Sequence, residues 1–274
     1  MGEKRHGSVG RRWARRLSRR GALAAGGVGL AAFAATGSGH ATTGDQATPP
    51  APHAEGRLAA RLTAPTTEVT PGLHQLGLDA ARDALLYVPT GYRPEQPAPF
   101  VLSLHGAGGN DRSGLYPLHD LADEAGLILL SPASRRQTWD VIFGAYGPDV
   151  AFIDRALTAT FARCAVDPAR IAIGGFSDGA SYALSLGLTN GDLFGHVLAF
   201  SPGFMVPAAS IGRPRIYVSH GTHDEVLPID RCSRRLVPQL QAAGYDVLYR
   251  EFDGPHTVPP AIAREALERF KNEG

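Results

Sequence analysis

A short glycine-rich turn constrains the fold of this chain more than any other segment. Residues 175–179 read Gly-Phe-Ser-Asp-Gly; an apolar run at 171–174 precedes them, and small and apolar residues follow at 180–184. A strand, a G-x-S-x-G turn and a helix in this order are typical of a sharp turn that holds a serine above the edge of a sheet. The glycines permit a cramped backbone that a Cβ atom would obstruct. The sequence therefore predicts Ser177 as a nucleophile at the N-terminus of a helix.

The remainder of the chain has the pattern of one α/β domain. Its 274 residues, 43% of them hydrophobic, are enough to bury a single core. From residue 71 onward, short apolar runs alternate with amphipathic helical patterns, which predicts a mostly parallel sheet covered by helices on both faces. Ligands of such sheets bind at the carboxyl ends of the strands. Strands are expected at 73–78, 84–88, 100–104, 127–130, 171–174, 197–200, 216–219 and 246–252, and helices at 118–125 and 150–161.

The first 41 residues have the composition of an export signal. They carry eight arginines and lysines but one acid, and an uncharged Ala-, Gly- and Leu-rich stretch follows at 21–37. This stretch is shorter than the roughly 20 apolar residues that a membrane span needs. A Ser-Arg-Arg sequence at 18–20 resembles the twin-arginine export signal, and small residues at 39 and 41 suit cleavage after Ala41. We expect that export machinery to deliver the protein to the periplasm or the extracellular space; an uncleaved amphipathic anchor is the alternative.

A change of composition marks the start of the domain. Residues 42–70 are rich in Ala, Thr, Pro and Gly and show no apolar periodicity. We expect a flexible linker there, followed by the catalytic domain at 71–274. The mature form is expected to have no stable membrane span.

The two cysteines are expected at opposite edges of the sheet. Cys164 precedes the strand at 171–174, whereas Cys232 follows the strand at 216–219. A disulfide needs Cα atoms within about 7 Å of each other, but a five-residue strand spans about 17 Å. We therefore expect no intramolecular disulfide.

A serine nucleophile needs a base and a carboxylate that orients the base. When the serine is on a G-x-S-x-G turn, the chain order is serine, acid, histidine. Asp224 follows the strand at 216–219, and His256 follows the strand at 246–252, so both are expected at the same edge of the sheet as Ser177. These three residues are the candidate catalytic triad.

Other residues near the triad have competing interpretations. The acid could be Glu225, Asp230 or Asp253 instead of Asp224, although Glu225 should point away from its neighbour. His256 is the one histidine that follows Asp224 in the sequence, so the candidate base has no rival there. His220 and His223 could suggest a metal pair, but without a third histidine or a cysteine cluster they are expected to shape the loop. We expect no metal and no cofactor.

A second glycine-rich turn is expected to help bind the oxyanion of the reaction. It follows the strand at 100–104, and the N–H of Ala107 is the candidate donor; the other donor is the N–H of Asp178. The carboxylate of Asp178 is expected in solvent, and His105 is expected to brace the turn. The turn lacks the Lys-Ser/Thr ending of a phosphate-binding loop.

Several apolar side chains fall in loops near the expected mouth of the site. They line a substrate pocket or, for about half of them, belong to the core. The segment at 201–213 is too short to form a helical lid, which favours small, soluble or aromatic esters. The candidate pocket residues are Trp139, Phe143, Tyr146, Phe204, Met205 and Leu227.

Four segments together resemble the α/β-hydrolase superfamily: Leu-His-Gly-Ala-Gly-Gly at 104–109, Gly-Phe-Ser-Asp-Gly at 175–179, His-Gly-Thr-His-Asp at 220–224 and Gly-Pro-His at 254–256. Within it, the chain is most similar to the phospholipase/carboxylesterase group, with some similarity to feruloyl esterases and polyhydroxybutyrate depolymerases. The resemblance implies an α/β-hydrolase fold without a large lid. The serine box departs from the Gln and Gly that many members of this group have at its fourth and sixth positions.

The triad and the resemblance predict a serine carboxylic-ester hydrolase that works through an acyl-enzyme. A small-molecule ester is the expected substrate. The basic residues precede the apolar stretch, so they favour targeting over nucleic-acid binding. The alternatives are a serine peptidase or acyltransferase on the same fold, and a non-catalytic binding protein.

Overall fold

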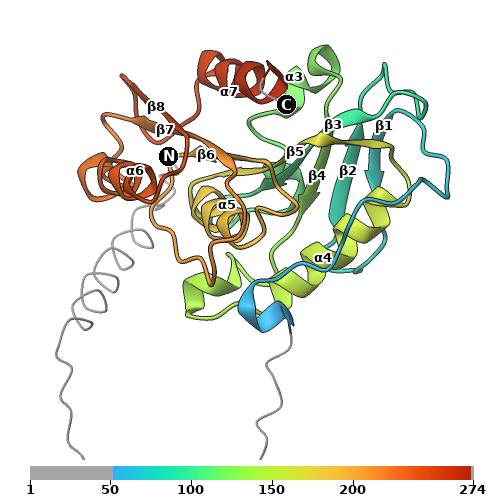
Figure 1. The fold of residues 1–274 in the computed structure, drawn as a ribbon, viewed down its shortest axis with the longest axis horizontal. Helices are drawn as coiled ribbons and strands as arrows, with labels where there is room; N and C mark the ends of the chain where they lie inside the picture. The colour runs from blue at the N-terminus through green and yellow to red at the C-terminus, as the bar shows by residue number, and fades with distance from the viewer. Residues whose placement is uncertain (1–51, 273–274) are drawn as a thin grey trace, which may run out of the picture. The chain divides into compact units, whose positions relative to one another are not determined.

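A computed structural model describes residues 52–272, which contain one eight-stranded sheet with helices on both faces (Figure 1). Its strand order is β1-β2-β4-β3-β5-β6-β7-β8; β2 is antiparallel to β1 and β4, and all other neighbours are parallel. Helices α3 and α7 lie on one face of the sheet, and α4 and α5 lie on the other. The expected α/β-hydrolase architecture is confirmed.

The strands are β1 Gly72–Gln75, β2 Ala84–Val88, β3 Ala98–Leu104, β4 Ile128–Pro132, β5 Val166–Phe176, β6 His196–Phe200, β7 Arg215–Gly221 and β8 Val247–Phe252. The helices are α2 Asp111–Gly114, α3 His119–Ala125, α4 Pro148–Phe161, α5 Asp178–Thr189, α6 Ser233–Ala242 and α7 Pro260–Asn272. Short 3-10 turns occur at η1 Pro52–Glu55, η2 Asp140–Phe143 and η3 Ile229–Arg231. Between β6 and β7 the chain forms no helix.

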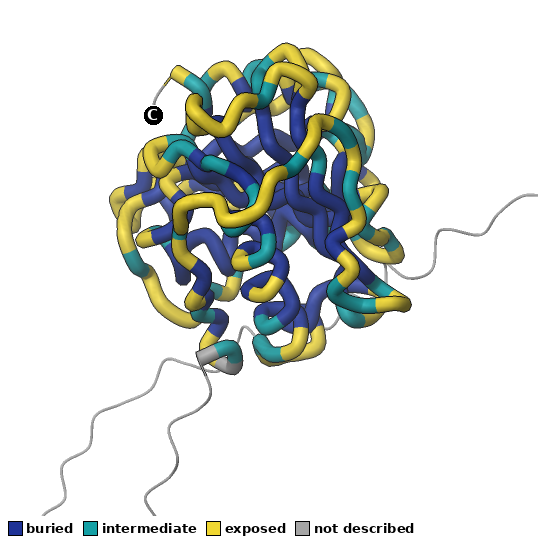
Figure 2. The backbone as a smooth tube through the Cα atoms, turned by 90° about the vertical axis from the view of Figure 1, so that its right-hand side faces the viewer, coloured by how far each residue is buried: buried dark blue, intermediate teal, exposed yellow. Residues whose placement is uncertain are grey.

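Burial explains why the central strands appear in the sequence as continuous apolar runs. Every residue of β3, β4 and β6 is buried, because helices cover both faces of the sheet. The edge strands β1 and β8 contain exposed residues. Figure 2 shows the buried residues gathered in the central strands, with the exposed residues in the surrounding loops and outer helix faces.

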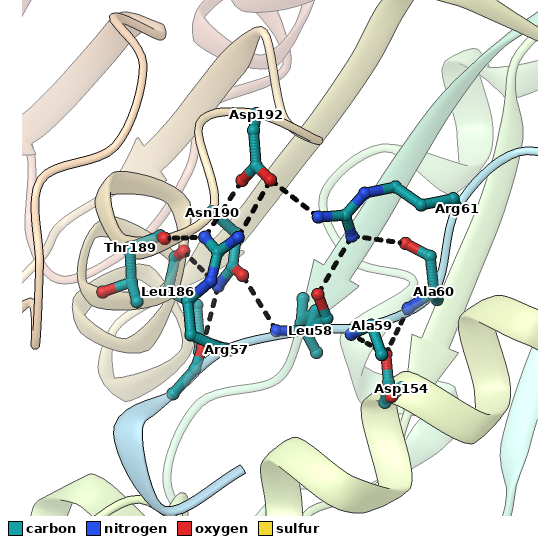
Figure 3. Close-up of polar contacts among 11 residues, drawn as sticks. Arg57, Leu58, Ala59, Ala60, Arg61, Asp154, Leu186, Thr189, Asn190 and Asp192 are labelled. Atoms are coloured by element: carbon teal, nitrogen blue, oxygen red, sulfur yellow. Dashed lines mark hydrogen bonds and ion pairs between the residues drawn. The ribbon is translucent and has the colours of Figure 1, made fainter. Parts of the chain in front are cut away.

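The segment from Gly56 to Ala60 packs against the domain, which differs from the flexible linker expected over residues 42–70. The side chain of Leu58 is only 2% exposed, and its N–H donates to Asn190 Oδ1 at 2.9 Å (Figure 3). The N–H groups of Ala59 and Ala60 donate to one oxygen of Asp154, at 2.8 and 2.7 Å. This segment and the arginine that follows it, residues 56–61, are called the strap below.

Two arginines of the strap complete its attachment. Arg57 forms a paired contact with the carboxylate of Asp192 at 3.0 and 2.9 Å, and Arg61 contacts the same carboxylate at 2.6 Å (Figure 3). Asp192 lies just beyond the C-terminal end of α5, and Asp154 lies on α4. The acceptors are more than 90 residues away in the chain, so local composition gives no sign of them.

Two further expectations concern the ends and the cysteines of the chain. The proposed signal at residues 1–41 and the first part of the expected linker lie outside the described residues. Between residues 52 and 272, no helix has both the length and the apolar character that crossing a membrane requires. Cys164 and Cys232 are both buried free thiols, and burial raises their pKa, to about 12 and about 11.

Candidate active site

The turn at the end of β5 has the strained geometry of a nucleophile elbow. Ser177 has φ 61° and ψ −122°, which is uncommon for a residue with a side chain. A Cβ atom on Gly179 would lie 2.1 Å from the carbonyl oxygen of Leu104, and one on Gly175 would lie 2.6 Å from the same oxygen. The two glycines thus allow α5 to begin directly against β3, with Ser177 at its N-terminal end.

The structure brings Ser177, His256 and Asp224 together in one hydrogen-bonded chain. The Oγ atom of Ser177 lies 2.9 Å from Nε2 of His256, and Nδ1 of His256 lies 2.5 Å from Oδ2 of Asp224. The three residues follow β5, β8 and β7, whose parallel carboxyl ends meet at one edge of the sheet. Ser177 can therefore donate its proton to a histidine whose other nitrogen donates to a carboxylate.

The carboxylate of Asp224 is buried and fixed by its own loop. Its Oδ1 atom accepts hydrogen bonds from the N–H groups of Val226 and Leu227, at 2.9 and 2.7 Å. Burial alone raises the pKa of Asp224, but hydrogen bonds from His220, His256 and Leu227 outweigh it and lower the pKa below its usual value. Asp224 is therefore ionised and oriented toward His256.

The rival acids do not contact His256. Asp253 pairs with His223 at 3.0 Å on the surface, and Asp230 pairs with Arg234 at 2.8 Å. Glu225 is exposed. Residues 52–272 contain no group of three histidine, cysteine or acidic side chains arranged to hold a metal ion.

The turn after β3 lies directly beside the serine. A Cβ atom on Gly106 would be 3.3 Å from Cβ of Ser177, and the next residue is Ala107. Among the described residues, the N–H of Ala107 has no hydrogen-bond acceptor, whereas the N–H of Gly108 donates to the carbonyl of Gln137 at 2.6 Å. The N–H of Asp178 is in the first turn of α5, where a helix offers no acceptor of its own. Both N–H groups proposed for the oxyanion are thus free to bind one.

His105 braces this turn, as expected. Its Nδ1 donates to the carbonyl of Gly106 at 2.7 Å, and its Nε2 accepts from the N–H of Ser134 at 2.9 Å. Burial lowers the pKa of His105 to about 4, so the ring is neutral and both contacts persist at neutral pH. The ring therefore ties the turn to the loop that follows β4.

Comparisons with known proteins find esterases of similar sequence and fold. A model of the phospholipase/carboxylesterase family matches residues 149–268, which include Ser177, Asp224 and His256. Solved structures of similar fold include a truncated carbohydrate esterase from gut microbiota (TM-score 0.59, 16% identity, 77% of this chain and 98% of that one). Another is a carboxylesterase from Bacillus cereus (TM-score 0.54, 19% identity, 72% and 96%). The chain has the α/β-hydrolase fold.

Curated proteins similar to this chain include feruloyl esterase C of Emericella nidulans, 29% identical over 170 residues, and a probable feruloyl esterase C of Aspergillus niger, 28% identical over 167 residues. The alignments cover 59% and 58% of this chain. The chain spans about three fifths of the length of these relatives (61% and 60%).

The side chain of Asp178 corrects one sequence-based expectation for this site. Its carboxylate does not lie free in solvent but accepts a hydrogen bond from Oγ1 of Thr138 at 2.7 Å. Burial raises the pKa of Asp178, against the opposing effects of Thr138 and of the charge of His256. The expectation was wrong because the loop after β4 folds over the start of α5, and such packing is not visible in local sequence.

The six candidate pocket residues separate into core and surface. Trp139 is fully buried: its ring stacks on Tyr182 with centroids 5.0 Å apart, and its Nε1 donates to the carbonyl of His105 at 2.9 Å. It is therefore a core residue and lines no pocket. Phe143 is 55% exposed, and the hydroxyl of half-buried Tyr146 donates to the carbonyl of Val206 at 2.8 Å.

The other three candidates lie near the first turn of α5. The N–H of Gly203 donates to Oγ of Ser181, one turn after the serine of the elbow, at 2.8 Å. A Cβ atom on Gly203 would be 3.1 Å from the side chain of Leu227, so this leucine covers the loop. Phe204, the next residue, and Met205 are half-buried in the same loop.

Tyr116 is a residue near the site that the sequence analysis missed. Its hydroxyl accepts from the N–H of Val258 and donates to the carbonyl of the same residue, both at 3.0 Å. Its ring meets Phe176 edge-on at 5.9 Å, and Phe176 packs against His256 at 4.5 Å. Tyr116 also lines a mostly apolar cavity of about 330 Å³ together with Leu73, Leu115, Pro117, Leu121, Val258 and Ala263. No motif identifies Tyr116, because its role depends on the folded position of residue 258.

Proposed function

We propose that this α/β-hydrolase is a serine carboxylic-ester hydrolase with Ser177, His256 and Asp224 as its catalytic triad. The observation that carries the proposal is the hydrogen-bonded chain of these three residues, which begins at a serine with strained backbone angles. A structural serine on an ordinary turn does not require a histidine and a buried carboxylate aligned behind it.

In the proposed reaction, His256 Nε2 removes the proton of Ser177 as its oxygen attacks the ester carbonyl. The N–H groups of Ala107 and Asp178 hold the resulting oxyanion. The tetrahedral intermediate then expels the alcohol, which takes the proton from His256, and an acyl group remains on Ser177. Water, activated by His256, attacks this acyl-enzyme and releases the acid. Asp224 remains ionised throughout and stabilises the imidazolium.

Small, soluble esters and aromatic esters are the proposed substrates. The loop between β6 and β7 has no helix that would act as a lid. The side chains of Phe204, Met205 and Leu227 offer apolar surface near the start of α5. The feruloyl esterase relatives are consistent with an aromatic acyl group.

The first test is hydrolysis of p-nitrophenyl acetate, butyrate and octanoate and of methyl ferulate by the chain that begins at residue 42, beside the Ser177→Ala variant. We expect hydrolysis that the variant lacks, with faster turnover of the short and the aromatic esters. A preference for long-chain emulsions would contradict the substrate proposal. Labelling by a serine-directed inhibitor without hydrolysis of any ester would favour a peptidase or an acyltransferase, and an absence of labelling would favour a binding protein.

Export through the twin-arginine route is also proposed, on the basis of the basic and apolar pattern of residues 1–41. Replacement of Arg19 and Arg20 by lysine should leave the full chain inside a bacterial host, whereas the unaltered chain should be recovered outside the cytoplasm. Equal export of both chains would contradict this route.

A further inference from the structure

A second histidine contacts the triad carboxylate. His220 is at the end of β7, four residues before Asp224, and the side chains of both are completely buried. Its Nε2 atom lies 2.8 Å from the carbonyl oxygen of Leu227 and 3.2 Å from Oδ2 of Asp224. Its Nδ1 atom lies 2.6 Å from the hydroxyl oxygen of Ser233, which is also fully buried at the start of α6.

These partners assign the tautomer of His220. Both oxygens near Nε2 can only accept, so Nε2 carries a proton and shares it between them. Ser233 can donate, so its hydroxyl proton points to Nδ1. The hydroxyl thereby keeps the imidazole proton on the nitrogen that faces Asp224.

The two oxygens of Asp224 have different partners. The N–H groups of Val226 and Leu227 occupy Oδ1, whereas His256 and His220 both approach Oδ2. The triad histidine and His220 thus share one acceptor atom. A second donor on that oxygen draws away part of the negative charge that would otherwise act on His256.

We infer that His220, with its tautomer held by Ser233, is a positioning residue that limits how strongly Asp224 binds the triad histidine. This inference rests on the proposed function, since it assumes that His256 is the base of the reaction. His220 touches neither the serine nor, in this arrangement, a substrate. Its effect reaches the reaction through Oδ2 of Asp224.

Other titratable groups face this chain of residues and set its surroundings. Asp178 on α5 interacts electrostatically with His256, and Cys232 at the start of α6 does so with Asp224. Glu251 on β8 interacts electrostatically with His220. Glu251 is itself paired with Arg234 at 2.6 Å. None of these three groups contacts Oδ2 of Asp224, so none of them takes the place of His220 at that atom when His220 is exchanged.

A matched pair of variants tests the inference. In His220→Gln the side-chain NH2 group takes the place of Nε2 and can still donate to Asp224, whereas in His220→Asn the amide matches Nδ1 and leaves Oδ2 without this donor. We expect the acidic limb of kcat/KM against pH to move up by about 0.5 to 1 pH unit in the Asn variant, the size expected for one hydrogen bond. The Gln variant should keep the wild-type midpoint.

Ser233→Ala provides a second test if the Asn variant does not fold. Without the hydroxyl, Nδ1 of His220 loses its partner and the ring is less firmly held against Asp224, so the acidic limb should shift in the same direction by a smaller amount. Equal midpoints in all variants, or equal shifts in the Gln and Asn variants, would show that His220 only supports its loop and would overturn the inference.

The titration of the His256 Nδ1–H proton resonance provides a readout that needs no substrate. We expect the same order of midpoints by NMR as by kinetics. Failure of the wild-type chain to hydrolyse any ester would contradict the proposed function, whereas coincident NMR midpoints for wild type and His220→Asn would contradict the inference alone.

Discussion

The two ends of helix α5 are fixed by different means. At its N-terminal end, the glycines at 175 and 179 let the backbone meet Leu104 at distances that no Cβ atom would tolerate, and the serine between them is strained. At its C-terminal end, the strap supplies hydrogen bonds and ion pairs to Asn190 and Asp192 (Figure 3). The N-terminal end is held by backbone packing that leaves N–H groups free for a ligand, whereas the C-terminal end is held by polar contacts that are already satisfied.

The largest expected effect is the loss of turnover when the serine at the N-terminal end of α5 is replaced. Ser177→Ala should lower kcat by about 10⁴- to 10⁶-fold, because it removes the nucleophile. It should leave the free energy of unfolding nearly unchanged, since Oγ is the only atom lost. Ester hydrolysis and urea unfolding of the same preparation measure both quantities. Residual activity within tenfold of wild type would contradict the assigned nucleophile.

Gly179→Ala should destabilise the fold by about 4 kcal/mol or more, because the new Cβ would lie 2.1 Å from the carbonyl oxygen of Leu104. Gly91→Ala is the matched control, since a Cβ there meets no atom within 4 Å. Urea unfolding of both variants measures the difference. Similar stabilities would mean that the reactive end does not depend on close backbone packing.

Leu58→Ala should lower the free energy of unfolding by about 2–4 kcal/mol, because it empties a buried site under the strap. The value of kcat/KM at a temperature where the variant is folded should change less than twofold. Arg61→Ala is the control: its ion pair is partly exposed and should contribute less than about 1 kcal/mol. A large loss of turnover in folded Leu58→Ala would show that the two ends of α5 are coupled.

The smallest effect concerns His196, which begins β6 a few residues after α5 ends. Neither of its ring nitrogens has a hydrogen-bond partner among the described residues. Burial, together with the charges of Arg215 and Arg269, lowers its pKa from 6.5 to about 4. Its contribution to stability is complete above pH 6.5 and is lost as the pH falls from about 6.5 to about 4, because the unfolded chain then binds a proton that the folded chain rejects.

His196→Leu should therefore flatten the fall in unfolding free energy over this pH window, by up to about 3 kcal/mol at pH 4. The pH dependence of kcat/KM should stay as in wild type, since His196 lies at the opposite edge of the sheet from Ser177. Urea unfolding at pH 4 to 8 measures the first effect. An unchanged slope would mean that His196 has the same protonation state in the folded and the unfolded chain over this pH range.

Local patterns were sufficient to predict the elbow, the sheet and the order of Ser177, Asp224 and His256. In each case the residue concerned closely follows the end of a strand, so the chain order predicts that its side chain lies at one edge of a parallel sheet. The structure brings these three residues into contact, as that reasoning requires.

Contacts between distant segments could not be predicted in this way. The strap depends on acceptors near residues 154 and 190, the carboxylate of Asp178 on Thr138, and the burial of Trp139 on Tyr182. Each contact joins residues that are far apart in the sequence, so no local sequence pattern relates them. Trp139 in particular is an aromatic residue in an irregular loop, and only its stacking reveals that the loop is packed inward.

The two buried cysteines make local opening in two parts of the domain measurable without any engineered label. Cys164 follows α4, two residues after Ala162, whose carbonyl accepts hydrogen bonds from the N–H groups of Thr66 and Thr67. Cys232 precedes α6 and lies close to Asp224. Because burial raises the pKa of both thiols, native molecules should resist alkylation, and each thiol should react with iodoacetamide only when its own neighbourhood opens. The two thiols thus report local opening at two separate places in the domain, the segment after α4 and the start of α6.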